Sequence, residues 1–150
     1  MEDDSRYWQI MTRQMPIVDK KDQEKFKNAR IAVIGCGGIG GQTIEMLARM
    51  GVGELVLVDE DSFDWTNLNR QILSQTDNIG VSKSETAKKK VEKINPYVKV
   101  KSFKTRLDIS NVGEIIKDAD IVIDALDNVL TRVILSRKSS QYRIPFIHGA

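Results

Sequence analysis

The chain has 150 residues, the length of a single domain, which is enough to bury a substantial hydrophobic core. Its 41% hydrophobic and 29% charged residues exclude a disordered or fibrous protein, and a net charge of +2 favours neither a nucleic-acid nor a membrane-surface partner. A single cysteine, Cys36, and a single histidine, His148, exclude an internal disulfide and a four-ligand zinc site. No segment approaches the roughly 20 apolar residues of a membrane span, and the acidic first residues are unlike a signal peptide, so we expect a cytoplasmic protein.

Residues 1–27 show no strand pattern, and we expect one or two helices there. After them, short apolar β-branched runs alternate with segments of helical spacing. The apolar runs stop at a glycine or an aspartate, which is typical of buried strands. We predict strands over 30–34, 55–58, 98–103, 121–123 and 145–147. We predict helices over 39–50 and 82–94 and a further helix after Asn128.

The helix over 39–50 is predicted from its apolar spacing and from Gly51, which follows it and is typical of a helix end. Its apolar and small side chains recur at helical intervals, at Ile39, Thr43, Met46, Leu47 and Met50.

Two later helices are predicted from the residues that begin them. Ser82 is followed three positions later by Glu85, the pattern of a capping box. Asn128 can cap a helix that carries Val129, Val133 and Ile134 as its apolar residues.

Alternating strands and helices predict an α/β fold with a doubly wound, mainly parallel, Rossmann-like sheet. We expect an N-terminal helical segment over 1–27 and one nucleotide-binding domain over 28–150. The last predicted strand lies three residues before Ala150, where such folds normally continue. We therefore expect a domain that is shortened at its C-terminus.

A glycine loop follows the first predicted strand and opens the first predicted helix of the sheet. Gly35, Gly37 and Gly40 form the pattern G-x-G-x-x-G. In this context the first glycine makes the tight turn, the second lets the backbone approach a phosphate, and the third permits close packing of helix and strand. Asp59 ends the second strand, where a carboxylate can accept hydrogen bonds from ribose hydroxyls. The pattern predicts a nucleotide site; the alternative is a glycine turn that serves packing alone.

Polar residues beyond Asp59 favour a triphosphate over a hydride carrier. Arg70 offers a planar, permanently charged fork for phosphate oxygens, and Asn67 can hydrogen-bond the same groups. Lys83 follows the Ser82 cap, so that its ammonium can reach an anion near that helix N-terminus. Asp127 lies just past a strand end, at the sheet edge where ligands bind in open α/β folds.

Together these motifs make the chain resemble the ThiF/MoeB/HesA family of ATP-dependent activators of ubiquitin-like proteins. Each motif is weak alone, but their order is specific and covers nearly the whole chain. The matching motifs are Gly35-x-Gly37-Gly38-x-Gly40, Asp59-x-Asp61, Asn67-Leu68-Asn69-Arg70-Gln71, Gly80-x-x-Lys83, Ile94-Asn95-Pro96 and Asp124-x-x-Asp127-Asn128.

The resemblance implies adenylation with ATP and Mg²⁺. Family members activate the C-terminal carboxylate of a β-grasp partner that ends in Gly-Gly, giving an acyl-adenylate and pyrophosphate. The motif match implies roles for the matching residues: a phosphate loop at Gly35, Gly37, Gly38 and Gly40, ribose and nucleotide contacts from Asp59, Asp61, Gln71 and Asn128, phosphate contacts from Asn67, Arg70 and Lys83, and magnesium organised by Asp127.

The resemblance also implies a homodimer. Arg13-Gln14 resembles an N-terminal Arg-Gln pair of the family, whose arginine reaches the ATP of the other subunit. Arg13 is therefore a candidate catalytic residue, although Tyr7 stands further from it than the family's tyrosine does.

Two other functions remain open on the residues alone. The glycine loop with Asp59 also fits a nicotinamide-dependent oxidoreductase domain, and the chain could be a nucleotide-binding scaffold without catalysis. Cys36, inside the glycine loop, is expected to be a buried core residue and not a nucleophile. We expect a structural role for His148, and Asp124 could support the loop that carries Asp127.

Overall fold

A computed structural model of the chain describes residues 4–149 and shows one parallel five-stranded sheet. The strand order is β3-β2-β1-β4-β5, with Ile34 at the end of β1 opposite both Val58 and Asp124. The strands are β1 (Arg30–Ile34), β2 (Glu54–Val58), β3 (Lys99–Phe103), β4 (Ile121–Asp124) and β5 (Phe146–His148).

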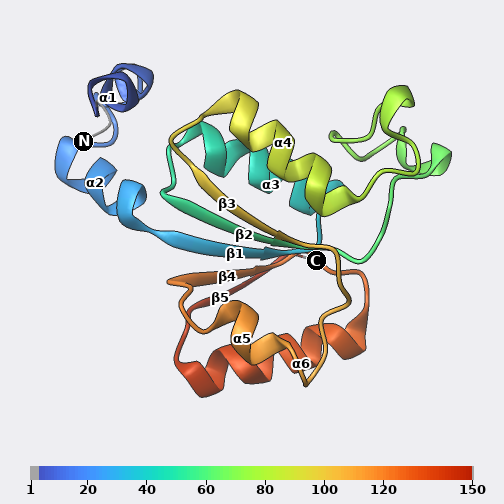
Figure 1. Cartoon of the computed structure of the whole chain (residues 1–150). Coiled ribbons are helices and arrows are strands. Elements are labelled where there is room, and N and C mark those ends of the chain that lie inside the picture. The colour runs from blue at the N-terminus through green and yellow to red at the C-terminus, as the bar shows by residue number, and fades with distance from the viewer. Residues whose placement is uncertain (1–3, 150) are drawn as a thin grey trace.

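Helices cover both faces of the sheet, as Figure 1 shows. Helices α3 (Gly38–Arg49) and α4 (Lys83–Ile94) lie on one face, and α5 (Val112–Ile116) and α6 (Val129–Tyr142) lie on the other. The chain runs outward from β1 to β3 and then returns to place β4 on the other side of β1. This doubly wound, Rossmann-like α/β fold confirms the predicted fold class, and the reversal between β1 and β4 is where such folds bind ligands.

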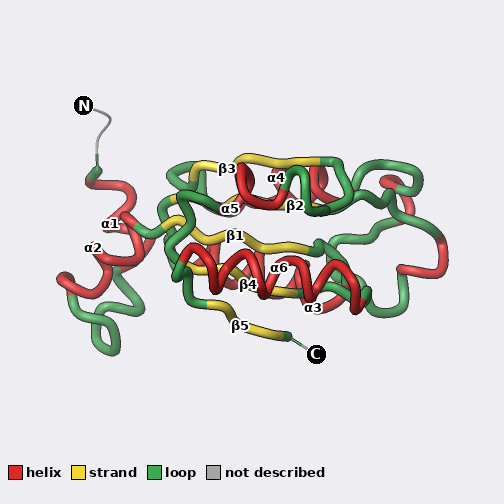
Figure 2. Tube along the Cα trace, turned by 90° about the horizontal axis from the view of Figure 1, so that it is seen from below, coloured by secondary structure: helices red, strands yellow, loops and turns green. Residues whose placement is uncertain are grey.

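The N-terminal helices lie beyond one end of the strands and cover neither face (Figure 2). They are α1 (Ser5–Met11) and α2 (Lys20–Asn28), and α2 leads directly into β1. The Tyr7 hydroxyl donates to the Gly51 carbonyl at 2.7 Å, just before β2 begins, and the Gln23 amide donates to the Tyr7 oxygen at 2.8 Å. These buried bonds fix α1 and α2 at the amino ends of the strands.

Alternate residues of the central strands point into two separate apolar layers. Ile31 and Val33 pack with α3 and α4, while Ala32 and Ile34 pack with α5 and α6. Burial on both faces explains the continuous apolar runs from which the strands were predicted. No helix in the described part of the chain is long and apolar enough to cross a membrane.

Helix α3 exists as predicted, and Leu47 packs against the core, but three of the other residues expected on its apolar face are exposed. Ile39, Met46 and Met50 are exposed, with Met46 at 57%, while the buried residues include Ile44 and Ala48. Gly40 and Ala48 share this buried face with Ile44, and the missing side chain at Gly40 lets the helix approach the end of β1 closely.

Helix α6 shows the same difference, because Val129 and Val133 are exposed whereas Leu135 and Ser139 are buried. Residue spacing located both helices, but of the large apolar residues expected on their faces only Leu47 and Ile134 pack against the core.

The caps are formed in part as predicted. The Ser82 side chain accepts the Glu85 amide, but the Glu85 carboxylate accepts from the Ser102 hydroxyl on β3 and does not return to the cap. Asn128 caps α6 through the Thr131 amide at 3.1 Å. The short helix α5 and the one-turn 3-10 helices η1 (Trp65–Asn67) and η2 (Thr76–Asn78) lack a clear periodicity and were not predicted.

We predict that Gly40→Ala destabilises the chain by about 3 kcal/mol, because an added Cβ would lie 1.8 Å from the Gly35 carbonyl oxygen. Gly38→Ala is the matched control, since its Cβ would meet nothing closer than 3.6 Å and alanine favours a helix. Chemical denaturation measures both variants. Equal stabilities would contradict the close packing described here.

Candidate functional site

A pocket of about 430 Å³ opens at the carboxyl ends of β1, β2 and β4, where the winding of the sheet reverses. The pocket is lined by residues from the glycine loop and from the ends of β1, β2 and β4. Further lining residues come from the β2–α4 loop and from the start of α4 and α6. Of the residues expected to bind nucleotide, the pocket is lined by Gly35, Gly37, Gly38, Asp59, Asp61, Arg70, Gln71, Lys83, Asp127 and Asn128.

The glycine loop forms the floor of the pocket at the start of α3. Gly35 has a φ of +100°, and a Cβ there would lie 2.5 Å from the Ala125 carbonyl oxygen, so only glycine fits. Gly37 caps α3 without a side-chain hydrogen bond, which leaves the first backbone N–H groups of the helix available to an anion. Gly40 does not line the pocket; it lies against Gly35 and sets the close contact of helix and strand.

Asp59 ties the end of β2 to the glycine loop. Its carboxylate accepts the backbone N–H of Cys36 at 2.7 Å and that of Asp61 at 2.8 Å. Burial raises the pKa of the Asp59 carboxyl above its usual value, and the two N–H bonds oppose that shift. The carboxylate is thereby held in one orientation, with lone pairs left for ribose hydroxyls.

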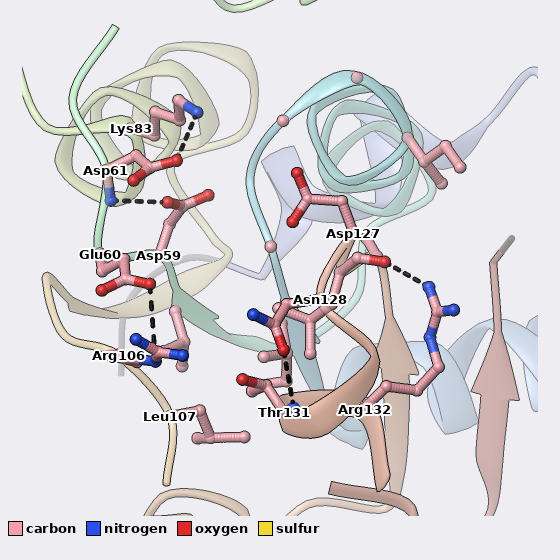
Figure 3. A pocket seen from close by; sticks show the side chains of 18 of the residues that line it. Asp59, Glu60, Asp61, Lys83, Arg106, Leu107, Asp127, Asn128, Thr131 and Arg132 are labelled. Atoms are coloured by element: carbon pink, nitrogen blue, oxygen red, sulfur yellow. Dashed lines mark hydrogen bonds and ion pairs between the residues drawn. The ribbon is translucent and has the colours of Figure 1, made fainter.

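Lys83 and Asp61 form an ion pair on the same side of the pocket. The Lys83 ammonium lies 3.0 Å from the Asp61 carboxylate, and only 7% of Lys83 is exposed. Figure 3 shows this pair beside Asp59, with Glu60 and Arg106 below it. Asp61 is the exposed partner of this pair, and Lys83, at the start of α4, is the buried cation on this side of the pocket.

Asp127 lies on the opposite side of the pocket (Figure 3). Its carboxylate is exposed and makes no hydrogen bond or ion pair within residues 4–149, whereas the neighbouring Asn128 side chain is occupied as the α6 cap. No group of three or more metal-binding side chains occurs in the described part of the chain. A single carboxylate beside a phosphate loop fits Mg²⁺, which keeps its waters and binds through one or two carboxylates and substrate phosphates.

Arg70 and Gln71 reach the pocket from the β2–α4 loop. The Arg70 guanidinium donates to the Thr66 carbonyl at 2.8 Å and to the Asn69 side chain at 3.0 Å, which leaves other donors free. The Gln71 amide oxygen is buried without a hydrogen-bond partner in the described residues. A buried polar atom of this kind is a candidate ligand contact.

Two expected site residues do not lie in the pocket. Asn67 is buried in the turn of η1, where its side chain accepts the Asp64 amide at 2.9 Å, so it shapes the loop instead of facing the phosphate site. Arg13 is exposed between α1 and α2, and the adjacent Gln14 donates to the Met50 carbonyl at the amino end of the sheet. A five-residue strand of about 15 Å separates that end from the pocket.

The structure adds pocket residues that motifs did not identify, chiefly Arg106 and Leu107 after β3 and Thr131 and Arg132 in α6. Arg106 lies 3.9 Å from Glu60 across the side of the pocket. These added residues carry no motif, although they follow strands whose carboxyl ends form the ligand edge of such a sheet.

Cys36 is fully buried in the glycine loop. Burial raises the pKa of its thiol well above the usual value, and the nearby Asp59 carboxylate adds to that shift. The thiol is therefore neither accessible nor ionised.

Comparison with known proteins supports the resemblance to the ThiF family. A model of the ThiF family matches residues 11–150. The SAMP-activating enzyme E1 of Haloferax volcanii is 40% identical over 136 residues, which are 91% of this chain and 50% of that protein. The molybdopterin-synthase adenylyltransferase of Haemophilus influenzae is 38% identical over 133 residues, 89% of this chain and 55% of its own length. The chain thus spans about half the length of these relatives.

Solved structures of other proteins are similar to this chain in fold and sequence. The E. coli tRNA N6-threonylcarbamoyladenosine dehydratase, TcdA, in complex with ATP superposes with a TM-score of 0.93 at 31% identity, covering 96% of this chain and 60% of that one. E. coli MccB with ATP gives a TM-score of 0.79, also at 31% identity, over 85% of this chain and 38% of its own.

Proposed function

Because the chain belongs to the ThiF family, we propose that it is the nucleotide-binding part of an enzyme that adenylates the C-terminal carboxylate of a ubiquitin-like protein with ATP. One observation carries the proposal: Arg70, Lys83 and Asp127, which come from three separate segments, line the same pocket as the glycine loop. Hydride transfer has no evident use for these three charges, whereas phosphoryl chemistry depends on such positioning and charge stabilisation.

The proposed partner is a β-grasp protein that ends in Gly-Gly. Support comes from relatives named as activating a SAMP or as a sulfur carrier protein adenylyltransferase, the latter from Thermus thermophilus at 35% identity. An exposed C-terminal tail of small residues could enter a pocket that is open at the sheet edge.

In the proposed reaction, a carboxylate oxygen of the partner attacks the α-phosphorus of ATP. The new P–O bond forms as the bond to the β-phosphate breaks, and pyrophosphate leaves with the electron pair. A carboxylate is already ionised near pH 7, so no general base is required. The chain's residues therefore bind and orient: N–H groups of α3 and the Arg70 and Lys83 side chains hold phosphate oxygens, and Asp59 holds the ribose.

Magnesium is part of this proposal. The charged side chains that line the pocket balance, with Asp59, Glu60, Asp61 and Asp127 against Arg70, Lys83, Arg106 and Arg132. A triphosphate adds several negative charges to this balanced set. When bound at Asp127, Mg²⁺ would neutralise part of that charge and polarise the phosphates.

We further propose that two copies of the chain associate. Arg13 and the pocket lie at opposite ends of the strands, so Arg13 can contact ATP only in another subunit. Exposed apolar side chains are available for such contact on α3. This α3 surface consists of Ile39, Met46 and Met50, which recur at helical intervals and are all exposed.

Lys83→Ala should slow adenylation by about 2–3 kcal/mol in activation free energy, because it removes a charge-assisted contact with the transferring group. Pyrophosphate–ATP exchange with a Gly-Gly-ending β-grasp protein measures this, and Arg70→Ala should behave similarly. Lys89→Ala, an exposed lysine on the same helix, is the control. Wild-type exchange in both Lys83→Ala and Arg70→Ala would remove them from the mechanism.

Light scattering at micromolar concentration should give twice the 17.0 kDa mass of one chain. Met46→Glu should reduce that mass to one chain, since it places a charge in the α3 surface, while Ile109→Glu, at an exposed apolar residue elsewhere, should not. A single-chain mass for the unmodified protein would contradict the proposed association.

A further inference from the structure

The carboxylate of Asp124 joins three parts of the chain at the end of β4. It is fully buried, although an unpaired carboxylate is costly to bury. One oxygen accepts the Leu126 N–H at 3.0 Å. The other lies 2.8 Å from the Arg132 Nε and 2.8 Å from the His148 Nδ1. Asp124 therefore links the loop after β4 to α6 and to the edge strand β5.

Arg132 also makes a direct contact with the loop after β4. Besides its bond to Asp124, its guanidinium donates through Nη2 to the Leu126 carbonyl, a contact drawn in Figure 3. Leu126 is thus held at its N–H by Asp124 and at its C=O by Arg132. A planar guanidinium can make both contacts at once with fixed geometry, which a lysine ammonium cannot do.

The next residue is Asp127, the proposed magnesium carboxylate. Within residues 4–149 its side chain has no partner that fixes its direction. Its position relative to the glycine loop therefore depends on the backbone that precedes it.

We infer that Arg132, acting with Asp124, is a positioning residue that holds Asp127 against the phosphate side of the pocket. The inference rests on the proposed function, because it assigns a role toward the magnesium nucleotide. Residues that orient a metal carboxylate without touching the metal commonly change metal affinity by about 10–100-fold.

Helix α6 has other contacts besides those of Arg132. Asn128 caps the helix, and Leu135 is buried in the core. His148 is the more exposed partner of Asp124, with 43% of its side chain accessible. The buried charge of Asp124 is thus balanced mainly by Arg132, and loss of Arg132 should release the loop before it affects the fold.

The test compares Arg132→Met, Arg132→Lys, Asp127→Asn and the control Arg137→Met, whose arginine is exposed on the same helix. Two quantities are measured on the 150-residue chain: hydrogen exchange of the Leu126 amide without ligand, and calorimetric affinity for ATP with and without Mg²⁺. The increase in ATP affinity on adding Mg²⁺, called the magnesium gain, reports on Asp127. The exchange rate of the Leu126 amide reports on the contacts that Asp124 and Arg132 make with Leu126.

For Arg132→Met we expect Leu126 exchange to rise about tenfold and the magnesium gain, which is the ratio of ATP affinity with Mg²⁺ to ATP affinity without it, to fall about tenfold. Loss of the Arg132 charge from the pocket lowers both affinities and therefore cancels in this ratio. Arg132→Lys, which keeps a charge beside Asp124, should recover part of the gain, and Arg137→Met should match wild type. Should Arg132→Met fail to fold, Arg132→Lys carries the test through the same two readouts.

A wild-type magnesium gain in the folded Arg132 variant, together with a lost gain in Asp127→Asn, would overturn the inference and leave the proposed function intact. A wild-type gain in Asp127→Asn would instead remove Asp127 from the proposed magnesium site, and the inference would fall with it.

Discussion

The close approach of helix α3 to the end of strand β1 is the constraint on which the site depends. A side chain at Gly35 would collide with the Ala125 carbonyl, and one at Gly40 would collide with the Gly35 carbonyl. With glycine at both positions, the loop that joins β1 to α3 turns tightly beside Ala125, and the N-terminus of α3 lies at the floor of the pocket. The buried face of α3 accordingly begins with Gly40 and continues with Ile44 and Ala48, while Met46 and Met50 are exposed.

The charged residues are arranged around this fixed loop by two hydrogen-bonded supports. On the β2 side, Asp59 binds backbone N–H groups of the glycine loop and of Asp61, and Asp61 in turn pairs with Lys83. On the β4 side, Asp124 and Arg132 hold the backbone that precedes Asp127. Each support joins segments that are distant in sequence, and the anion-binding helix N-terminus lies between them. This arrangement accounts for a pocket with a balanced set of charges around the N-terminus of α3.

Much of the fold and part of the site could be predicted from the sequence, for physical reasons. Strands buried on both faces must be apolar throughout, so that 30–34 and 55–58 were recognisable, and a glycine loop has few other uses between a strand and a helix. The buried face of α3 was not predicted from large side chains, because the positions that face the core at four-residue intervals carry glycine and alanine as well as Ile44. The motif that contains Asn67 gave its neighbourhood and not its orientation. The sequence offered Asp124 as a support for the loop of Asp127, but its partners Arg132 and His148 depend on contacts that only the folded chain forms.

The claim that this pocket accepts a triphosphate and not a nicotinamide dinucleotide can be measured directly. Both nucleotides use a glycine loop and a strand-end carboxylate such as Asp59, so only the charges of Arg70, Lys83 and Asp127 separate them. Isothermal titration of the chain with ATP and Mg²⁺, and separately with NAD, compares the two affinities under one set of conditions. We expect tighter binding of ATP with Mg²⁺. Tighter binding of NAD would contradict the adenylation account.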